Sequence, residues 1–171
     1  DDVPDNLSIE DRWILAEFAN SMEKVENAWK NLDIYTATQA LKTFGTGILP
    51  SHWLEMSKSR LYDGDKNAAW TIHRIVRDLM SGLSPVCPFF THHISSTLYQ
   101  TSAVDVREFP SRTPNDDSLR ELTSSIEDFN GITWKTKKDA GLSLNAPISG
   151  IEIPDNLKDF TAILTQMHKL E

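Results

Sequence analysis

Apolar and polar residues recur with the period of an α-helix in the first part of the chain. Ser8 is a suitable N-cap, and Asp11, three residues later, places negative charge near the helix N-terminus. Trp13 lies off the apolar face, so it either packs against a neighbouring element or makes an exposed domain contact. The pattern predicts a long helix whose apolar face consists of Ile14, Leu15, Phe18, Met22, Val25, Trp29 and Leu32.

A second helical pattern follows Asp33, which is the next candidate N-cap. Gly45, Gly47 and Pro50 predict a kink or break before a new helix starts at Ser51. The apolar positions before the break are Ile34, Ala37, Leu41, Phe44 and Ile48. Around the new start one face carries Leu49, Trp53, Met56 and Arg60, and the opposite, solvent-facing side carries Ser51, Glu55, Lys58 and Tyr62.

Two more helices are predicted before residue 112. Helix 67–83 has Arg74 and Arg77 on its outer face, and Pro88 suits the first turn of a fourth helix. The inner positions of helix 67–83 are Ala69, Ile72, Val76, Leu79 and Leu83. Residues 1–112 are therefore predicted to form an antiparallel helix bundle.

The pattern changes in residues 113–171. After a polar linker, a helix is expected from residue 118 to residue 129, where Asn130 and Gly131 end it. Short strands are expected at residues 132–134 and 148–153, and a last helix follows Pro154. The predicted fold is mainly α, with a small C-terminal α+β appendage.

Composition limits the class of protein. The 171 residues are 39% hydrophobic, which suffices for a core, and the net charge of −8 argues against a protein that coats nucleic acid, DNA included, non-specifically. The single Cys87 excludes an intrachain disulfide framework and favours a reducing compartment. The sequence holds no apolar run of about 20 residues and begins unlike a signal peptide, so a cytoplasmic protein is expected.

Residues with catalytic or metal-binding chemistry are few. His92 and His93 are adjacent, and adjacent helical side chains point about 100° apart, which argues against a zinc site. Cys87 has no visible base nearby and is expected to be a buried structural thiol. The sequence contains no glycine-rich phosphate loop, so we predict no catalytic residue and no metal site in this chain.

The stretch Met-Ser-Lys-Ser at residues 56–59 has two interpretations. It resembles the lysine loop with which class I aminoacyl-tRNA synthetases bind ATP, or it forms part of an amphipathic helix. A phosphate-binding loop of this kind requires a parallel α/β sheet beside it. Because Lys58 lies between two helical patterns, the helical interpretation is favoured.

Three motifs occur in order along the bundle. They are Asp-Arg-Trp-Ile-Leu at residues 11–15, Trp-Leu-Glu-x-x-Lys-x-Arg-Leu-Tyr at 53–62, and Pro-x-x-Pro-Phe-x-Thr at 85–91. A Phe-Pro pair follows at residues 109–110. Together they resemble the helical anticodon-binding domain of the valyl, isoleucyl and leucyl class I synthetases, and the Glu-x-x-Lys form favours the valyl branch. Residues 134–145 are similar to the tail of archaeal-type valyl enzymes.

The resemblance implies a tRNA-recognition module that contacts the anticodon arm. The family's ATP- and Mg²⁺-dependent catalytic core would lie upstream of Asp1 in the same polypeptide, so the chain alone is expected to be inactive and to need no cofactor. RNA loops are recognised by stacking on aromatic side chains or arginine planes and by hydrogen bonds. The candidate tRNA-binding residues are Lys58, Arg60, Tyr62, Arg74, Arg77, Lys135, Lys137 and Lys138.

Two alternatives remain open from the sequence. One is a stand-alone helical interaction protein, related to a synthetase, that binds another protein through Trp13 or Trp70. The other is the same domain from an isoleucyl or leucyl enzyme. Arg60 also allows a second interpretation, because it lies on the apolar side of its helix and could extend along the end of the bundle.

Overall fold

The computed structural model describes residues 3–100, 109–110 and 117–171. Within these residues, no helix combines the length and the apolar character that crossing a bilayer requires. The helices are α1 (Ile9–Lys30), α2 (Ile34–Lys42), the π-helical η1 (Thr43–Trp53), α3 (Leu54–Tyr62), α4 (Lys66–Leu83), α5 (Pro88–Tyr99), α6 (Asp117–Arg120), α7 (Thr123–Asp139), the 3₁₀-helical η2 (Asp155–Phe160) and α8 (Thr161–His168).

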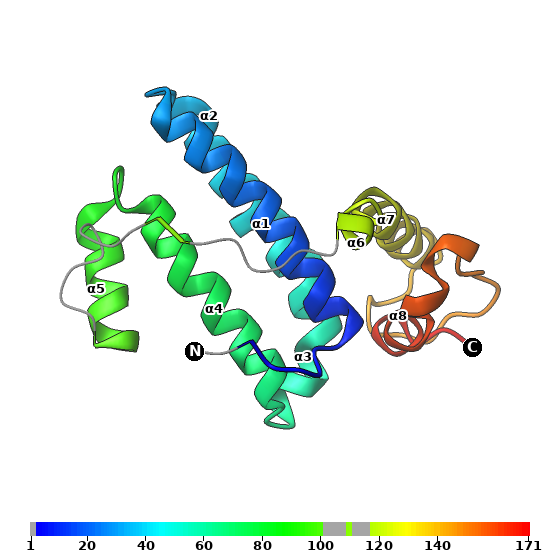
Figure 1. Ribbon diagram of the computed structural model, residues 1–171. Coiled ribbons are helices and arrows are strands. Elements are labelled where there is room, and N and C mark those ends of the chain that lie inside the picture. The colour runs from blue at the N-terminus through cyan, green and yellow to red at the C-terminus, as the bar shows by residue number, and fades with distance from the viewer. Residues whose placement is uncertain (1–2, 101–108, 111–116) are drawn as a thin grey trace.

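Helix α1 lies at the centre of the molecule. The continuous rod of α2, η1 and α3 packs along it together with α4, and α5 packs on the far side of α4. Helices α6 to α8 lie on the other side of α1 from α5 (Figure 1). The predicted helical bundle is confirmed, and so are the N-caps Ser8 and Asp33 and the start of α5 at Pro88.

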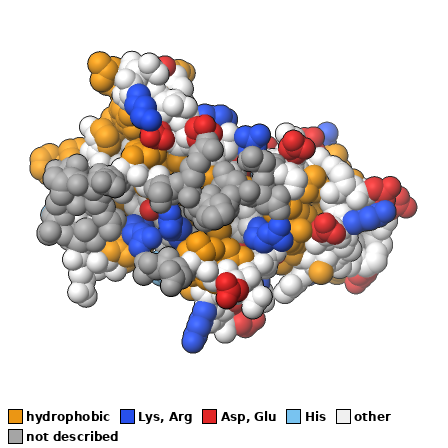
Figure 2. All heavy atoms as spheres, viewed as in Figure 1, with side chains coloured by type: hydrophobic (Ala, Val, Ile, Leu, Met, Phe, Trp, Pro, Cys, Tyr) orange, Lys and Arg blue, Asp and Glu red, His pale blue; other side chains and the backbone are white. Residues whose placement is uncertain are grey.

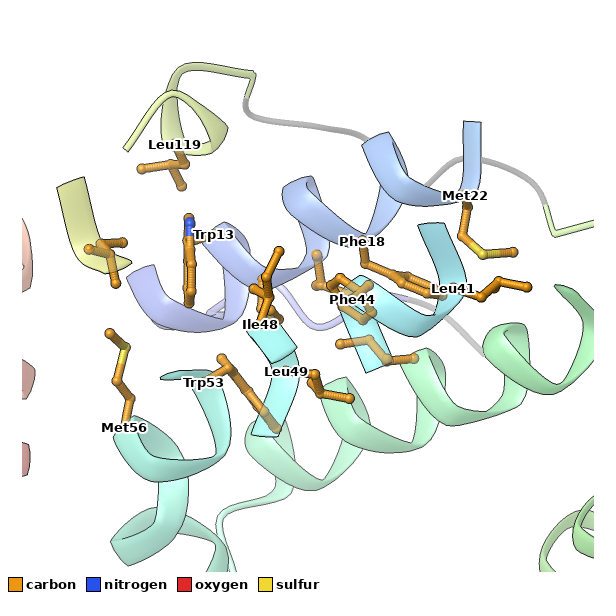
Figure 3. Close-up of a cluster of buried hydrophobic side chains, with 14 of the residues drawn as sticks. Trp13, Phe18, Met22, Leu41, Phe44, Ile48, Leu49, Trp53, Met56 and Leu119 are labelled. Atoms are coloured by element: carbon orange, nitrogen blue, oxygen red, sulfur yellow. The ribbon is translucent and has the colours of Figure 1, made fainter. Parts of the chain in front are cut away.

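Trp13 packs against the C-terminal region. Its side chain is fully buried, its Nε1 donates to Thr123 Oγ1 at 3.0 Å, and its ring meets Phe160 edge-on at 6.4 Å. Figure 3 shows Trp13 pointing toward Leu119 of α6 while Phe18 points toward Phe44 of the rod. Helix α1 is therefore covered on more than one side, which explains an apolar residue off its main stripe.

Of the kink or break predicted near Pro50, the break is wrong. The helix continues through η1 with hydrogen bonds from residue i to residue i−5, as from Leu54 N to Leu49 O. A π-helical turn is wider than an α-helical one, so it accommodates the proline ring and the missing N–H without ending the helix.

The two faces predicted for residues 49–62 are confirmed. Trp53 and Met56 are buried, whereas Lys58 and Tyr62 are exposed. Ser57 is also fully buried, so the Met-Ser-Lys-Ser stretch is an integral part of α3 and not a loop. The helical interpretation of this stretch is correct.

The buried face of α4 is shifted by one residue from the predicted face. Its buried line consists of Ala68, Thr71, Ile75, Asp78 and Gly82, and the larger predicted residues are only half-buried beside it. Gly82 explains the offset, because a Cβ there would lie 3.1 Å from Leu41 Cδ2 and 3.2 Å from Met22 Cε. Close packing, more than side-chain hydrophobicity, selects this face.

The predicted strands of the C-terminal region are wrong. Asn130 and Gly131 lie inside α7, which continues to Asp139 through the first predicted strand. In place of the strand predicted at residues 148–153, the described residues show a single parallel bridge between Ile148 and Leu170. The boundary placed between residues 112 and 113 lies outside the described residues and stays a prediction.

A buried polar network explains why α7 continues through Asn130. The Asn130 amide lies 2.8 Å from Nδ1 of His52 in η1 and 2.7 Å from Nε2 of His168 in α8. Because the amide nitrogen donates, Nδ1 of His52 is assigned as an unprotonated acceptor, and because the amide oxygen accepts, Nε2 of His168 is assigned as the donor. This tertiary pairing outweighs the tendency of Asn-Gly to end a helix.

Burial lowers the pKa of both histidines in this network. The pKa of His168 falls to about 4 because of burial and the charges of Lys137 and His52, and burial lowers the pKa of His52. The Nδ1 atom of His168 is buried without a hydrogen-bond partner, so a proton placed there would have no acceptor. The native state therefore favours neutral His168.

Arg60 connects three helix ends. Its guanidinium contacts Glu10 Oε1 at 2.6 Å and Asp11 Oδ2 at 2.7 Å in the first turn of α1. It also contacts Oδ2 of Asp65, the N-cap of α4, at 3.0 Å, and donates to Ser8 Oγ at 2.7 Å. Although burial lowers the pKa of Arg60, the hydrogen bonds that it donates to Asp11 and Asp65 and the charges of Asp11 and Glu10 raise the pKa overall.

We expect Arg60→Met to destabilise the chain strongly. The substitution keeps a side chain of similar length but leaves the buried carboxylates of Glu10 and Asp11 without their cation. Removing one partner of a buried ion pair typically costs about 3–5 kcal/mol. Urea unfolding should show this loss for Arg60→Met and a change under about 0.5 kcal/mol for Lys58→Met on the exposed face. Equal stabilities of the two variants would contradict the role of Arg60.

We expect His168 to make the chain acid-sensitive. Because the unfolded chain binds its proton near pH 6.5 and the folded chain only near pH 4, stability falls as the pH drops through this window. The loss is on the order of 3 kcal/mol at most. His168→Gln should flatten the dependence of the unfolding free energy on pH between 7 and 4, whereas His92→Gln, at an exposed position, should not. Identical slopes for both variants would refute this assignment.

Candidate nucleic-acid interface

An open groove of about 510 Å³ separates the rod from the C-terminal region. One wall comes from η1 and α3, with Ser51, Glu55 and Lys58, and the other from Trp134 of α7 and Asn145 of the following loop. Helix α7 also packs on η1, and α8 packs on α3, which closes the base of this groove. The groove therefore brings Lys58, a predicted site residue, into one site with Trp134, which is distant from it in the sequence.

Helix α3 presents two candidate residues at the groove and beyond it. Lys58 lines the groove, is 54% exposed and lies 3.5 Å from Glu55 Oε1 through its Nζ. Tyr62 follows one helical turn later and is 83% exposed. An exposed ion pair of this kind is weak, so Lys58 remains available to a phosphate.

The three lysines of α7 have different environments. Lys135 and Lys138 are exposed, and Lys138 lies one turn beyond Trp134, on the same side of the helix. Lys137 is fully buried and donates from Nζ to the carbonyl oxygens of Leu144 at 2.8 Å and His168 at 2.7 Å. Its pKa is lowered by burial and by the charge of Lys169.

The predicted contact between Lys137 and tRNA gains no support from this environment and stays a prediction. A fully buried ammonium that is held by two carbonyl oxygens does not reach a phosphate on the surface. Its contacts instead fasten the loop after α7 to the end of α8, next to the groove. In the sequence, residues 135–138 appear only as a basic turn. The partners of Lys137, Leu144 and His168, lie outside the helix that contains it, so the helical pattern does not indicate its burial.

Trp134 has a fixed position in the groove. Its ring stacks on His52 at 5.7 Å with an interplanar angle of 30°, and it meets His168 edge-on at 5.7 Å. Both histidines are held by Asn130, so the network behind the groove orients the indole. Trp134 is not among the residues predicted to bind tRNA, because the strand incorrectly predicted at residues 132–134 separates it from its helical neighbours.

Arg74 and Arg77 lie elsewhere, beside a hollow of about 300 Å³ between α4 and α5. Arg74 Nε pairs with Asp78 Oδ2 at 2.6 Å, and Arg77 Nε lies 3.8 Å from Asp78 Oδ1. Their side chains are 15% and 26% exposed, so the outer face predicted for them is only partly open. The structure therefore divides the candidate residues into two separate clusters.

Arg60 does not belong to either cluster. Its contacts with Glu10, Asp11 and Asp65 give it a structural role, in agreement with the second interpretation of its position on the apolar side. On the face shown in Figure 2, lysine and arginine side chains form small groups interspersed with acidic ones. This arrangement fits an acidic protein with local basic sites.

In the part of the chain that the structure describes, the remaining reactive residues form no metal site. The described residues contain no group of three or more metal-ligating side chains, and His92 and His93 are exposed on α5. Cys87 is exposed at the start of α5, so the prediction of a buried thiol is wrong. Pro88 begins the helix immediately after it, which places Cys87 at the N-cap and outside the core.

Comparison with known proteins identifies the family. Residues 11–153 match the family described as the anticodon-binding domain of tRNA ligase. The chain is 36% identical over 151 residues to a valine–tRNA ligase of Saccharolobus solfataricus, with 86% of this chain and 18% of the relative covered. It is 31% identical over 156 residues to that of Methanothrix thermoacetophila, with 86% and 17% covered.

A third relative, the valine–tRNA ligase of Aeropyrum pernix, is 28% identical over 172 residues, which cover 93% of this chain and 21% of the relative. The chain thus spans about a fifth of the length of the curated relatives it matches. These similarities confirm the resemblance to the valyl branch that residues 53–62 indicated. The chain belongs to the anticodon-binding domain family of tRNA ligases.

Proposed function

We propose that this chain is the tRNA-recognition module of a valine–tRNA ligase and that it contacts the anticodon arm of tRNA. The observation that carries the proposal is the family match over residues 11–153, joined by similarity to valine–tRNA ligases of three archaea. The groove beside Lys58 and Trp134 supplies the combination of cation and aromatic ring that RNA recognition uses.

The rest of the polypeptide is the second partner in this proposal. Because the chain corresponds to about a fifth of its relatives, a catalytic part of the same polypeptide would attach valine to the tRNA with ATP and Mg²⁺. The chain's own task is to bind and orient the anticodon arm. A location in the cytoplasm, where aminoacylation supplies protein synthesis, belongs to the same proposal.

We rank the candidate contact residues by their exposure and by their partners in the structure. Lys58, Tyr62, Lys135 and Lys138 are exposed and are the residues we assign to tRNA. Arg74 and Arg77 form a secondary cluster between α4 and α5. Arg60 and Lys137 have buried structural partners and are left out of the proposed contact surface.

The alternatives receive less support. An interaction protein that binds through Trp13 would need that side chain on the surface, and Trp13 is fully buried. Trp70 is half-buried and packs against the core. The isoleucyl and leucyl branches are disfavoured by the valine–tRNA ligases among the relatives.

We expect the triple variant Lys58→Ala, Lys135→Ala and Lys138→Ala to weaken binding to a valine tRNA transcript by roughly tenfold at moderate salt. Each lysine that neutralises a phosphate contributes a counterion-release term of about 0.7 to 0.9 to the salt slope. Filter-binding titrations at several salt concentrations should therefore show a slope smaller by about two to three for the variant.

The matched control replaces Lys24, Lys30 and Lys158 with alanine. These lysines are also exposed, and none of them lines the groove, so the control has the same net charge without touching the proposed surface. Its affinity and slope should stay close to those of the unaltered chain. Equal losses for both triple variants would show that only net charge matters and would remove the assignment of these residues.

A further inference from the structure

The groove contains a flat aromatic surface with polar groups around it. Trp134 is half-buried, and the contacts with His52 and His168 hold its ring in place. Among the described residues, no hydrogen bond involves the indole N–H of Trp134, and this atom is not among the buried unpaired ones. The ring therefore offers both a stacking surface and a donor to an occupant of the groove.

The polar groups around Trp134 differ in what they can bind. Glu55 offers a carboxylate acceptor, Asn145 an amide with donors and an acceptor, and Ser51 a hydroxyl group. Lys58 lies in the groove wall, and Lys138 is exposed one helical turn beyond Trp134. Planar, hydrogen-bonding and anionic parts of one ligand would each find a partner here.

We propose that this groove binds a single unstacked nucleotide from an RNA loop, with its base against Trp134 and its flanking phosphates beside Lys58 and Lys138. The proposal rests on the proposed function and deepens it by assigning one subsite. A volume of about 510 Å³ falls within the roughly 300–1,000 Å³ of small-molecule sites, so it accommodates one nucleotide but no duplex. The occupant must therefore be a base turned out of its stack.

The fixed ring favours binding, because little side-chain freedom is lost when a base stacks on it. Trp134 is anchored through two histidines to Asn130, and the facing wall belongs to the continuous η1–α3 helix. Both walls thus exist before RNA arrives. Stacking on a preformed aromatic surface requires no particular base, whereas the acceptor on Glu55 favours a base with an exocyclic amino group.

The test compares two hairpins with the same stem. One carries the natural anticodon loop of a valine tRNA, and in the other each loop base is replaced by an abasic spacer, which leaves all phosphates in place. We expect the unaltered chain to bind the natural loop about tenfold more tightly, because base stacking on an aromatic side chain contributes this order of affinity. The backbone contribution is the same for both hairpins.

Ser51→Trp tests the groove itself. Ser51 is exposed, so the larger side chain fills the groove without disturbing the core, and the preference for the natural loop should disappear. The control is Ser124→Trp, at an exposed position of α7 outside the groove, which should keep the preference. Asn145→Ala, a smaller change in the loop wall, should reduce the preference partially.

The outcomes separate this inference from the proposed function. If the unaltered chain binds both hairpins equally well, or if Ser51→Trp keeps the tenfold preference, the nucleotide subsite is wrong although RNA binding stands. If the unaltered chain binds neither hairpin, the proposed function fails as well. Loss of the preference in Ser51→Trp alone, with unchanged affinity for the abasic hairpin, supports the subsite.

Discussion

The buried carboxylate of Asp11 sets the arrangement of the bundle. Its side chain is fully buried at the start of α1, and it accepts hydrogen bonds from Trp53 Nε1 at 3.1 Å and from Arg60 at 2.7 Å. A buried charge is strongly destabilising unless it is paired. The end of the rod must therefore lie against the start of α1, and Asp65 adds the start of α4 to the same point. Three helix ends meet because one carboxylate needs partners.

A second buried polar group fixes the C-terminal region. Asn130 joins His52 of η1 to His168 of α8, and Lys137 ties the loop after α7 to the last residue of α8. Hydrophobic contacts such as that between Trp13 and Phe160 contribute buried apolar area, but they tolerate small shifts of one packed element against another. Directional hydrogen bonds in a low-dielectric interior do not, so they define the position of α7 against the rod.

The sequence predicted the elements of the bundle because their signals are local. Caps at Ser8 and Asp33, helical periodicity in α1 and the rod, and Pro88 at the start of α5 depend on neighbours within a few residues. The predictions that were wrong concern positions whose structure depends on residues far away in the sequence. The helix at Asn130 is maintained by His52 and His168, and the face of α4 is selected by the space that Gly82 leaves for Met22 and Leu41.

The candidate site shows the same division. Exposure of Lys58 and Tyr62 followed from helical phase, but the burial of Lys137 and the importance of Trp134 depended on how α7 meets the rod. One wall of the groove is positioned by Arg60 and the other by Asn130. Both anchors have buried polar partners, and both determine how Lys58 and Trp134 lie across the groove. In the proposed function, recognition by a small number of surface residues on an acidic protein would therefore depend on polar groups in its interior.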